Sequence, residues 1–139
     1  MLTFNRRCCL FCYRFAPVVT ADHLDAALCA IDQLGRRGLR RGEMRLLLDF
    51  LAVRRFEVDA AAIQALALRR VRSVPSGVDI RSAHVLSGVT RERMHDFYRR
   101  NLTGSSITTR RFGCMLEALF WLEAQAYSPN DAEPVLVAT

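Results

Sequence analysis

The chain has 139 residues, enough for one domain or for one compact domain with an appendage. Its 51% apolar and 24% charged residues are typical of a soluble globular protein and exclude a disordered or fibrous chain. All 20 basic residues are arginine, which excludes Schiff-base chemistry and a Walker lysine. The formal net charge of +6 suits a nucleic-acid partner, although charge alone does not establish one. No apolar stretch approaches the roughly 18 residues of a membrane span.

The first 19 residues carry three of the five cysteines. An odd number of cysteines without regular spacing is a poor disulfide framework, so we expect a reduced, cytoplasmic protein. A closed metal site needs four ligands, and few candidates are near. They are Cys8, Cys9 and Cys12, with Cys29 or His23 as the fourth. We therefore predict an apolar arm over residues 1–19, with no metal and no cofactor.

Two segments of residues 20–55 show the apolar spacing of amphipathic helices. The first, from a Thr20 N-cap to Gly35, carries Leu24, Leu28, Ile31 and Leu34; the second, over 41–55, carries Met44, Leu47, Leu48 and Leu51. The connection 35–42 reads GRRGLRRG, and its glycines break a helix. We predict a helical hairpin over 20–55 that serves dimerisation or partner binding.

The rest of the chain also favours helices. Asp59 is a candidate N-cap for a helix that turns Ile63, Leu66 and Ala67 inward. Shorter helices are predicted over 79–86 and 90–100, followed by a long helix over 108–126 and a loose tail over 127–139. No segment alternates convincingly as a strand, so the predicted fold class is all-α.

The segment from Ile80 to Arg100 fits the local requirements of a helix-turn-helix. Ala83 is a small residue for the crossing of two helices, and Gly88 permits the turn between them. Val89 and Met94 are apolar residues that lock the second helix onto the first, and Thr90 is a suitable N-cap for it.

This segment resembles the helix-turn-helix of the Cro/lambda-repressor-like (Xre) family. A polar loop, NLTGSS, follows it, and then Phe112, Met115, Leu116, Ala118 and Leu119 match a patterned helix of that family in type and spacing. The resemblance covers residues 59–122 and implies a DNA-binding domain over 59–126. The chain departs from the family at His84, where alanine is favoured, and at Ile80-Arg81, where a polar residue usually opens the motif.

The resemblance implies that the helix after Thr90 enters the major groove. The residues expected to read bases are then Thr90, Arg91, Glu92, Arg93 and His95. Those expected to hold phosphates are Arg69, Arg70, Arg72, Arg81, Arg99, Arg100, Thr103, Ser105 and Ser106. A homodimer would double the site, with Leu119, Phe120, Trp121 and Leu122 of the last helix as its seam.

The predicted function is therefore a transcriptional regulator that binds a palindromic site in double-stranded DNA as a homodimer. Two alternatives stay open: an antitoxin-like or adaptor module that binds a protein through residues 20–55, and a basic RNA-binding protein that uses the arginines of 35–42. No local motif indicates nucleophilic catalysis or a phosphate loop, so an enzyme is not predicted.

Overall fold

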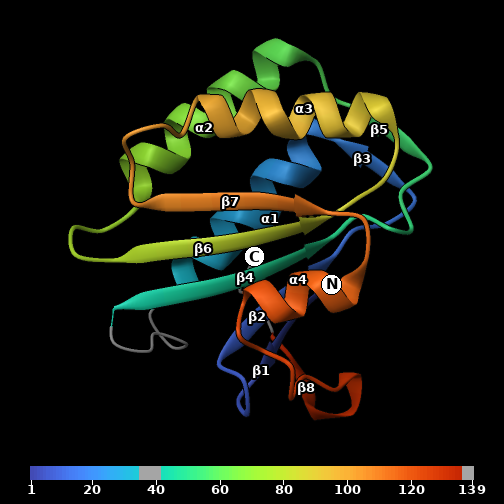
Figure 1. Cartoon of the computed structure of the whole chain (residues 1–139). Helices are drawn as coiled ribbons and strands as arrows, with labels where there is room; N and C mark the ends of the chain where they lie inside the picture. Colours follow the sequence, from blue (N-terminus) through green and yellow to red (C-terminus); the bar gives the residue numbers. More distant parts are fainter. Residues whose placement is uncertain (35–41, 136–139) are drawn as a thin grey trace.

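The computed structural model describes residues 1–34 and 42–135, and a six-stranded mixed sheet lies at its centre (Figure 1). Its strands are β1 (Leu2–Asn5), β2 (Leu10–Arg14), β4 (Glu43–Asp49), β6 (Asp79–Val85), β7 (Ile107–Phe112) and β8 (Ala132–Pro134). Their order is β7-β6-β4-β2-β1-β8. The first four in this order are parallel, whereas β1 is antiparallel to both of its neighbours. A separate small sheet pairs β3 (Val18–Thr20) with β5 (Arg55–Glu57).

The helices cover the two faces of the large sheet unequally (Figure 1). They are α1 (Ala21–Leu34), α2 (Ala60–Ser73), α3 (Val89–Arg100) and α4 (Met115–Trp121), with a 3₁₀ helix at Pro129–Asp131. Strands β2, β4, β6 and β7 lie side by side in the sheet in the same order as in the sequence. Each connection between two of these parallel strands therefore moves toward the same edge of the sheet. Right-handed crossovers then place α1, α2 and α3 on one face. Among the helices of the described residues, only α4 packs on the other face, and it covers part of that face.

Each face of the sheet has its own apolar core. Leu46 and Leu48 of β4 point toward the side of α1, α2 and α3, whereas Leu47 between them points toward α4. On β6, Ala83 belongs to the α4 side as well. This period of two is what a strand buried on both faces requires.

The all-α prediction is wrong, because the fold contains both helices and a six-stranded sheet. Strands β4, β6 and β7 lie where helices were predicted. Residues 43–49, 79–85 and 108–112 were expected to be helical and are strand residues of the sheet. A strand covered on both faces can hold a continuous apolar run, as β4 does at Leu46–Leu48, and short runs of this kind also satisfy helical spacing. The helix-turn-helix over 80–100 is therefore not formed, since its first helix is strand β6.

Three helices lie close to where the sequence predicts them. The hydroxyl of Thr20 accepts a hydrogen bond from the His23 amide at 3.3 Å, as an N-cap of α1 should. The Asp59 carboxylate accepts one from the Ala62 amide at 2.8 Å at the start of α2. Gly88, rather than the expected Thr90, is the N-cap residue of α3, and its φ of +102° is one that a residue with a Cβ rarely adopts.

The N-terminal segments are part of the same sheet rather than an arm and a helical hairpin. Residues 1–19 hold β1, β2 and β3, and the second half of the expected hairpin is β4, which pairs with both β2 and β6. Segment 35–41, which carries four arginines, lies outside the described residues. In the described part of the chain, no helix is both long enough and apolar enough to cross a membrane.

Candidate anion-binding surface

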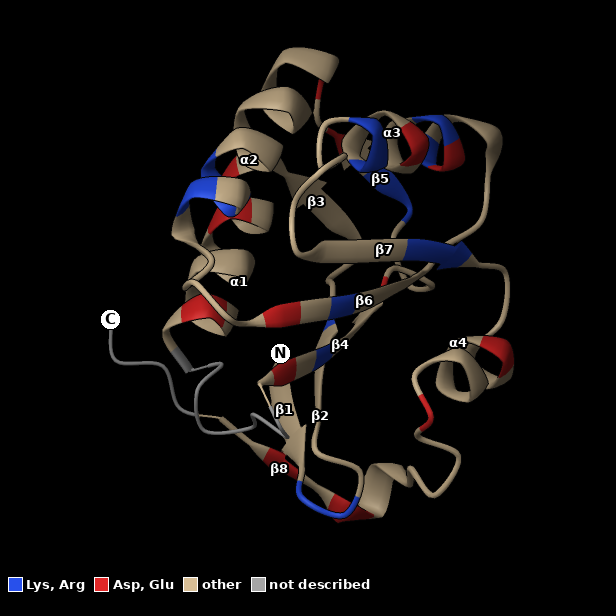
Figure 2. Ribbon diagram, turned by 60° about the vertical axis from the view of Figure 1, so that its left-hand side comes forward, with Lys and Arg blue, Asp and Glu red and all other residues tan. Residues whose placement is uncertain are grey.

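Arginine side chains gather where α3 passes beside β7, the edge strand of the sheet. Figure 2 shows the basic stretches of these two elements close together. They line one shallow depression, which we call the arginine surface: Arg93, Arg99 and Arg100 from α3, and Arg110 and Arg111 from β7, with Asp96 and Thr103 completing the lining.

The helical period explains the contribution of α3. Arg93, Asp96 and Arg100 follow one another at spacings of three and four residues, which places them on one face of a helix. The other face buries His95 and Tyr98 against the core. The outer face of α3 therefore carries arginines near its start and at its end, with Asp96 between them.

The strand period explains the contribution of β7. Thr109 and Arg111 point toward α3, where the Thr109 hydroxyl lies 3.2 Å from Nε2 of His95. Arg110, one residue away, points toward the α4 side, where its guanidinium lies 5.3 Å from the Phe112 ring centre. The arginine surface thus continues around the edge of the sheet.

Among the described residues, only Arg111 of these five arginines has carboxylate partners. Arg111 lies 3.0 Å from Asp96 and 3.5 Å from Glu92. Across residues 1–34 and 42–135, no acidic group lies within 4 Å of the other four guanidinium groups. These four are Arg93, Arg99, Arg100 and Arg110. The surface therefore carries uncompensated positive charge in contact with solvent.

Two neutral histidines lie beneath the surface. The rings of His84 and His95 are 4.7 Å apart, edge to face, and both side chains are buried. Burial lowers the pKa of His95 to about 4, although nearby Asp96 favours its protonated form. Burial and the adjacent His95 hold the pKa of His84 well below its ordinary range. Neither ring adds charge to the surface at neutral pH.

The five residues expected to read bases do not share one accessible face. Arg93 belongs to the arginine surface and Thr90 is exposed, whereas His95 is buried and bonded to β7. Arg91 is turned back onto the Ser87 carbonyl, which it contacts at 3.1 Å. Glu92 faces Arg111.

The residues expected to hold phosphates divide into three groups. Arg99, Arg100 and Thr103 come together in the arginine surface. Arg69, Arg70 and Arg72 lie on α2, where the first two pair with carboxylates of α1. Arg81, Ser105 and Ser106 line a groove on the α4 side, and Arg81 lies 3.4 Å from Glu43.

The expected dimer seam is only partly accessible. Leu119 and Leu122 are buried between α4 and the sheet, and Trp121 is half-buried. Phe120 is 71% exposed and is the one member of the four that points freely into solvent.

Sequence reasoning missed Arg110 and Arg111 because it placed them in a helix. A signal was present: Ile107, Thr108 and Thr109 are β-branched residues in a row, which favours a strand. A strand there sends the two arginines to opposite faces, one toward α3 and one toward α4.

Within the described ranges 1–34 and 42–135, no three His, Cys, Asp or Glu side chains cluster to hold a metal ion. Comparison of the chain with protein families, with curated proteins and with solved structures finds no match. The chemistry of the arginine surface is therefore the most informative feature for function.

Proposed function

We propose that the protein binds the phosphodiester backbone of nucleic acid through the arginine surface. The observation that carries the proposal is the convergence of Arg93, Arg99, Arg100 and Arg110 without carboxylate partners in the described chain. Unpaired guanidinium groups bind phosphate oxygens in a bidentate geometry, and several of them together bind a polyanion far better than a single anion.

The proposed binding recognises charge and shape rather than an operator sequence. The helix pair that would present base-reading side chains is absent, because β6 takes the place of its first helix. Contacts to phosphates position a nucleic acid without reading its bases. We therefore expect similar affinity for different sequences of the same length and strand number.

Two matched double variants test the proposal, each removing two arginines from the C-terminal part of a helix. Arg99→Ala with Arg100→Ala removes charge from the arginine surface, whereas Arg69→Ala with Arg72→Ala removes the same charge from α2. The probes are fluorescein-labelled 20-mers of single-stranded DNA, RNA and duplex DNA, followed by fluorescence anisotropy at low salt.

We expect the α3 double variant to weaken binding by about tenfold or more, as loss of phosphate contacts should, and the α2 double variant by less than about twofold. The three probes identify which nucleic acid is preferred. Equal losses in the two variants would show that net charge alone governs binding. Undiminished binding by the α3 variant would contradict the proposal.

A further inference from the structure

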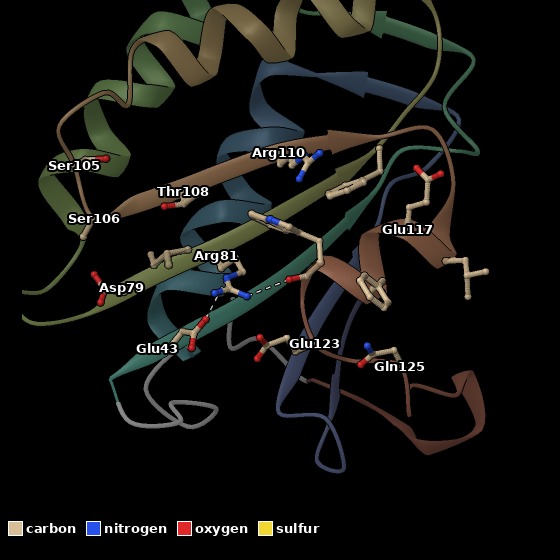
Figure 3. A pocket seen from close by; sticks show the side chains of 15 residues that line it. Glu43, Asp79, Arg81, Ser105, Ser106, Thr108, Arg110, Glu117, Glu123 and Gln125 are labelled. Atoms are coloured by element: carbon tan, nitrogen blue, oxygen red, sulfur yellow. Dashed lines mark hydrogen bonds and ion pairs between the residues drawn. The ribbon is translucent and has the colours of Figure 1, made fainter.

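The α4 side of the sheet carries a groove that adjoins the arginine surface. Strands β6 and β7 form its floor, and α4 forms one wall (Figure 3). Arg110 lines both the groove and the arginine surface, because it sits on the edge strand and points toward α4. A nucleic-acid strand whose phosphates lie on the arginine surface can therefore extend into the groove while its phosphates stay in contact with the arginines.

Aromatic rings stand on the α4 wall of this groove. Phe120 is 71% exposed, and its neighbour Leu116 is 78% exposed. Trp121 is half-buried, with its ring centre 5.6 Å from that of Phe112 and 5.5 Å from the Arg81 guanidinium. An exposed ring beside a supported one is a surface on which a planar base can stack.

Two arginines from the sheet hold α4 in place. Buried Arg45 donates to the carbonyls of Leu122 at 2.6 Å and Glu123 at 3.1 Å, and it also contacts the Cys8 carbonyl. Arg81 donates to the Trp121 carbonyl at 3.0 Å. These bonds satisfy carbonyls at the C-terminal end of α4, where cations are favourable. The aromatic wall is thus fixed before any ligand arrives.

Charges of both signs line the groove: Arg81 and Arg110 are basic, whereas Glu43, Asp79, Glu117 and Glu123 are acidic. Arg110 lies on the β7 side, whereas Glu43, Glu123 and Gln125 lie on the side of the groove away from β7 (Figure 3). Carboxylates repel phosphates but accept hydrogen bonds from the amino groups of bases. A backbone held near Arg110, with its bases turned into the groove, keeps its phosphates away from Glu43 and Glu123.

We infer that this groove stacks the unpaired bases of a single strand whose phosphates occupy the arginine surface. The inference rests on the proposed function and makes the preferred ligand single-stranded, since bases paired in a duplex cannot turn onto Phe120. Proteins that bind single strands combine basic grooves with aromatic stacking in the same way.

The experiment compares two single-stranded DNA 12-mers with the same number of phosphates, one with thymine bases and one abasic. Binding of both is measured by anisotropy, and Trp121, the only tryptophan of the chain, reports contact through its own fluorescence. The variant is Phe120→Ala, with Leu116→Ala as the control for an equally exposed apolar residue of α4 and Phe120→Tyr as the variant that keeps the ring.

We expect the wild-type chain to bind the thymine strand about tenfold more tightly than the abasic strand, with a change of Trp121 fluorescence for the thymine strand only. Phe120→Ala should remove most of this preference and leave abasic binding unchanged. Leu116→Ala and Phe120→Tyr should keep it.

Equal affinities of the wild type for the two strands, or a preference that survives Phe120→Ala, would overturn base stacking while leaving phosphate binding intact. Failure to bind either strand at low salt would contradict the proposed function and this inference with it.

Discussion

The last turns of α2 and α3 are both rich in arginine, yet the fold uses them in different ways. Arg69 and Arg70 of α2 meet α1, which supplies Asp25 and Asp32 as partners. Arg99 and Arg100 of α3 meet β7, which supplies two further arginines instead of carboxylates. The neighbouring element, not the arginines themselves, decides whether a basic turn stabilises the fold or is left free to bind a partner.

The largest effect that tests this contrast concerns Arg70. Its side chain is 3% exposed and forms an ion pair with Asp32. Arg70→Leu leaves the Asp32 carboxylate without that partner, so we expect the free energy of unfolding to fall by about 3 kcal/mol. Urea unfolding followed by circular dichroism measures it. The Arg69 side chain is 57% exposed in its pair with Asp25, so Arg69→Leu should lower the free energy of unfolding by less than about 1 kcal/mol. Similar losses in both variants would contradict the contrast.

The second prediction concerns the pH dependence of stability, which the buried histidines beneath the arginine surface should produce. The unfolded chain binds a proton at His95 near pH 6.5, whereas burial lowers the pKa of native His95 to about 4. Between these values the unfolded state holds more protons, so stability falls as the pH is lowered. We expect His95 alone to contribute a loss on the order of 2–3 kcal/mol between pH 7 and pH 4, and buried His84 to add to it.

Denaturant unfolding at successive pH values measures this loss. The variant His95→Gln should be less stable at pH 7 but should lose less stability on acidification. A pH dependence identical to that of the wild type would show that His95 does not contribute to it.

The smallest effect concerns the stability of the arginine surface itself. Arg99→Ala with Arg100→Ala should change the free energy of unfolding by no more than about 0.5 kcal/mol, because neither side chain has a carboxylate partner among the described residues. Thermal melts measure it, with Arg70→Leu as the destabilised reference. A loss as large as that of Arg70→Leu would mean that these arginines hold the fold together.

The sequence predicts the helices of this fold better than its strands. Caps at Thr20 and Asp59 and the glycine before α3 are local signals, and each marks a helix start in the structure. Strands β4 and β6 give no such signal: β4 holds the apolar run Leu46–Leu48, and β6 mixes apolar with polar residues without strict alternation. Their identity depends on partners distant in the chain, which periodicity within a short window does not contain.

For the arginine surface too, the sequence predicts the contribution of the helix but not that of the strand. The helical spacing of Arg93 and Arg100 is visible in the sequence, and these two residues come together with Arg99. Arg110 and Arg111 join them only because β7 pairs with β6 at the edge of the sheet. The pairing of Arg69 with Asp25 likewise depends on how α1 packs on α2, so the sequence could not separate free arginines from paired ones.

The salt dependence of binding tests the central claim most directly. Binding of a labelled single-stranded 20-mer is measured at several salt concentrations for the wild type and for Arg99→Ala. If three or four phosphates lie on the arginine surface, the logarithm of the binding constant should fall with the logarithm of salt concentration with a slope of about −2 to −3. Arg99→Ala should reduce the magnitude of that slope by about 0.7, whereas Arg72→Ala should leave it unchanged. A wild-type slope near zero, or a slope that Arg99→Ala does not alter, would contradict phosphate binding at this surface.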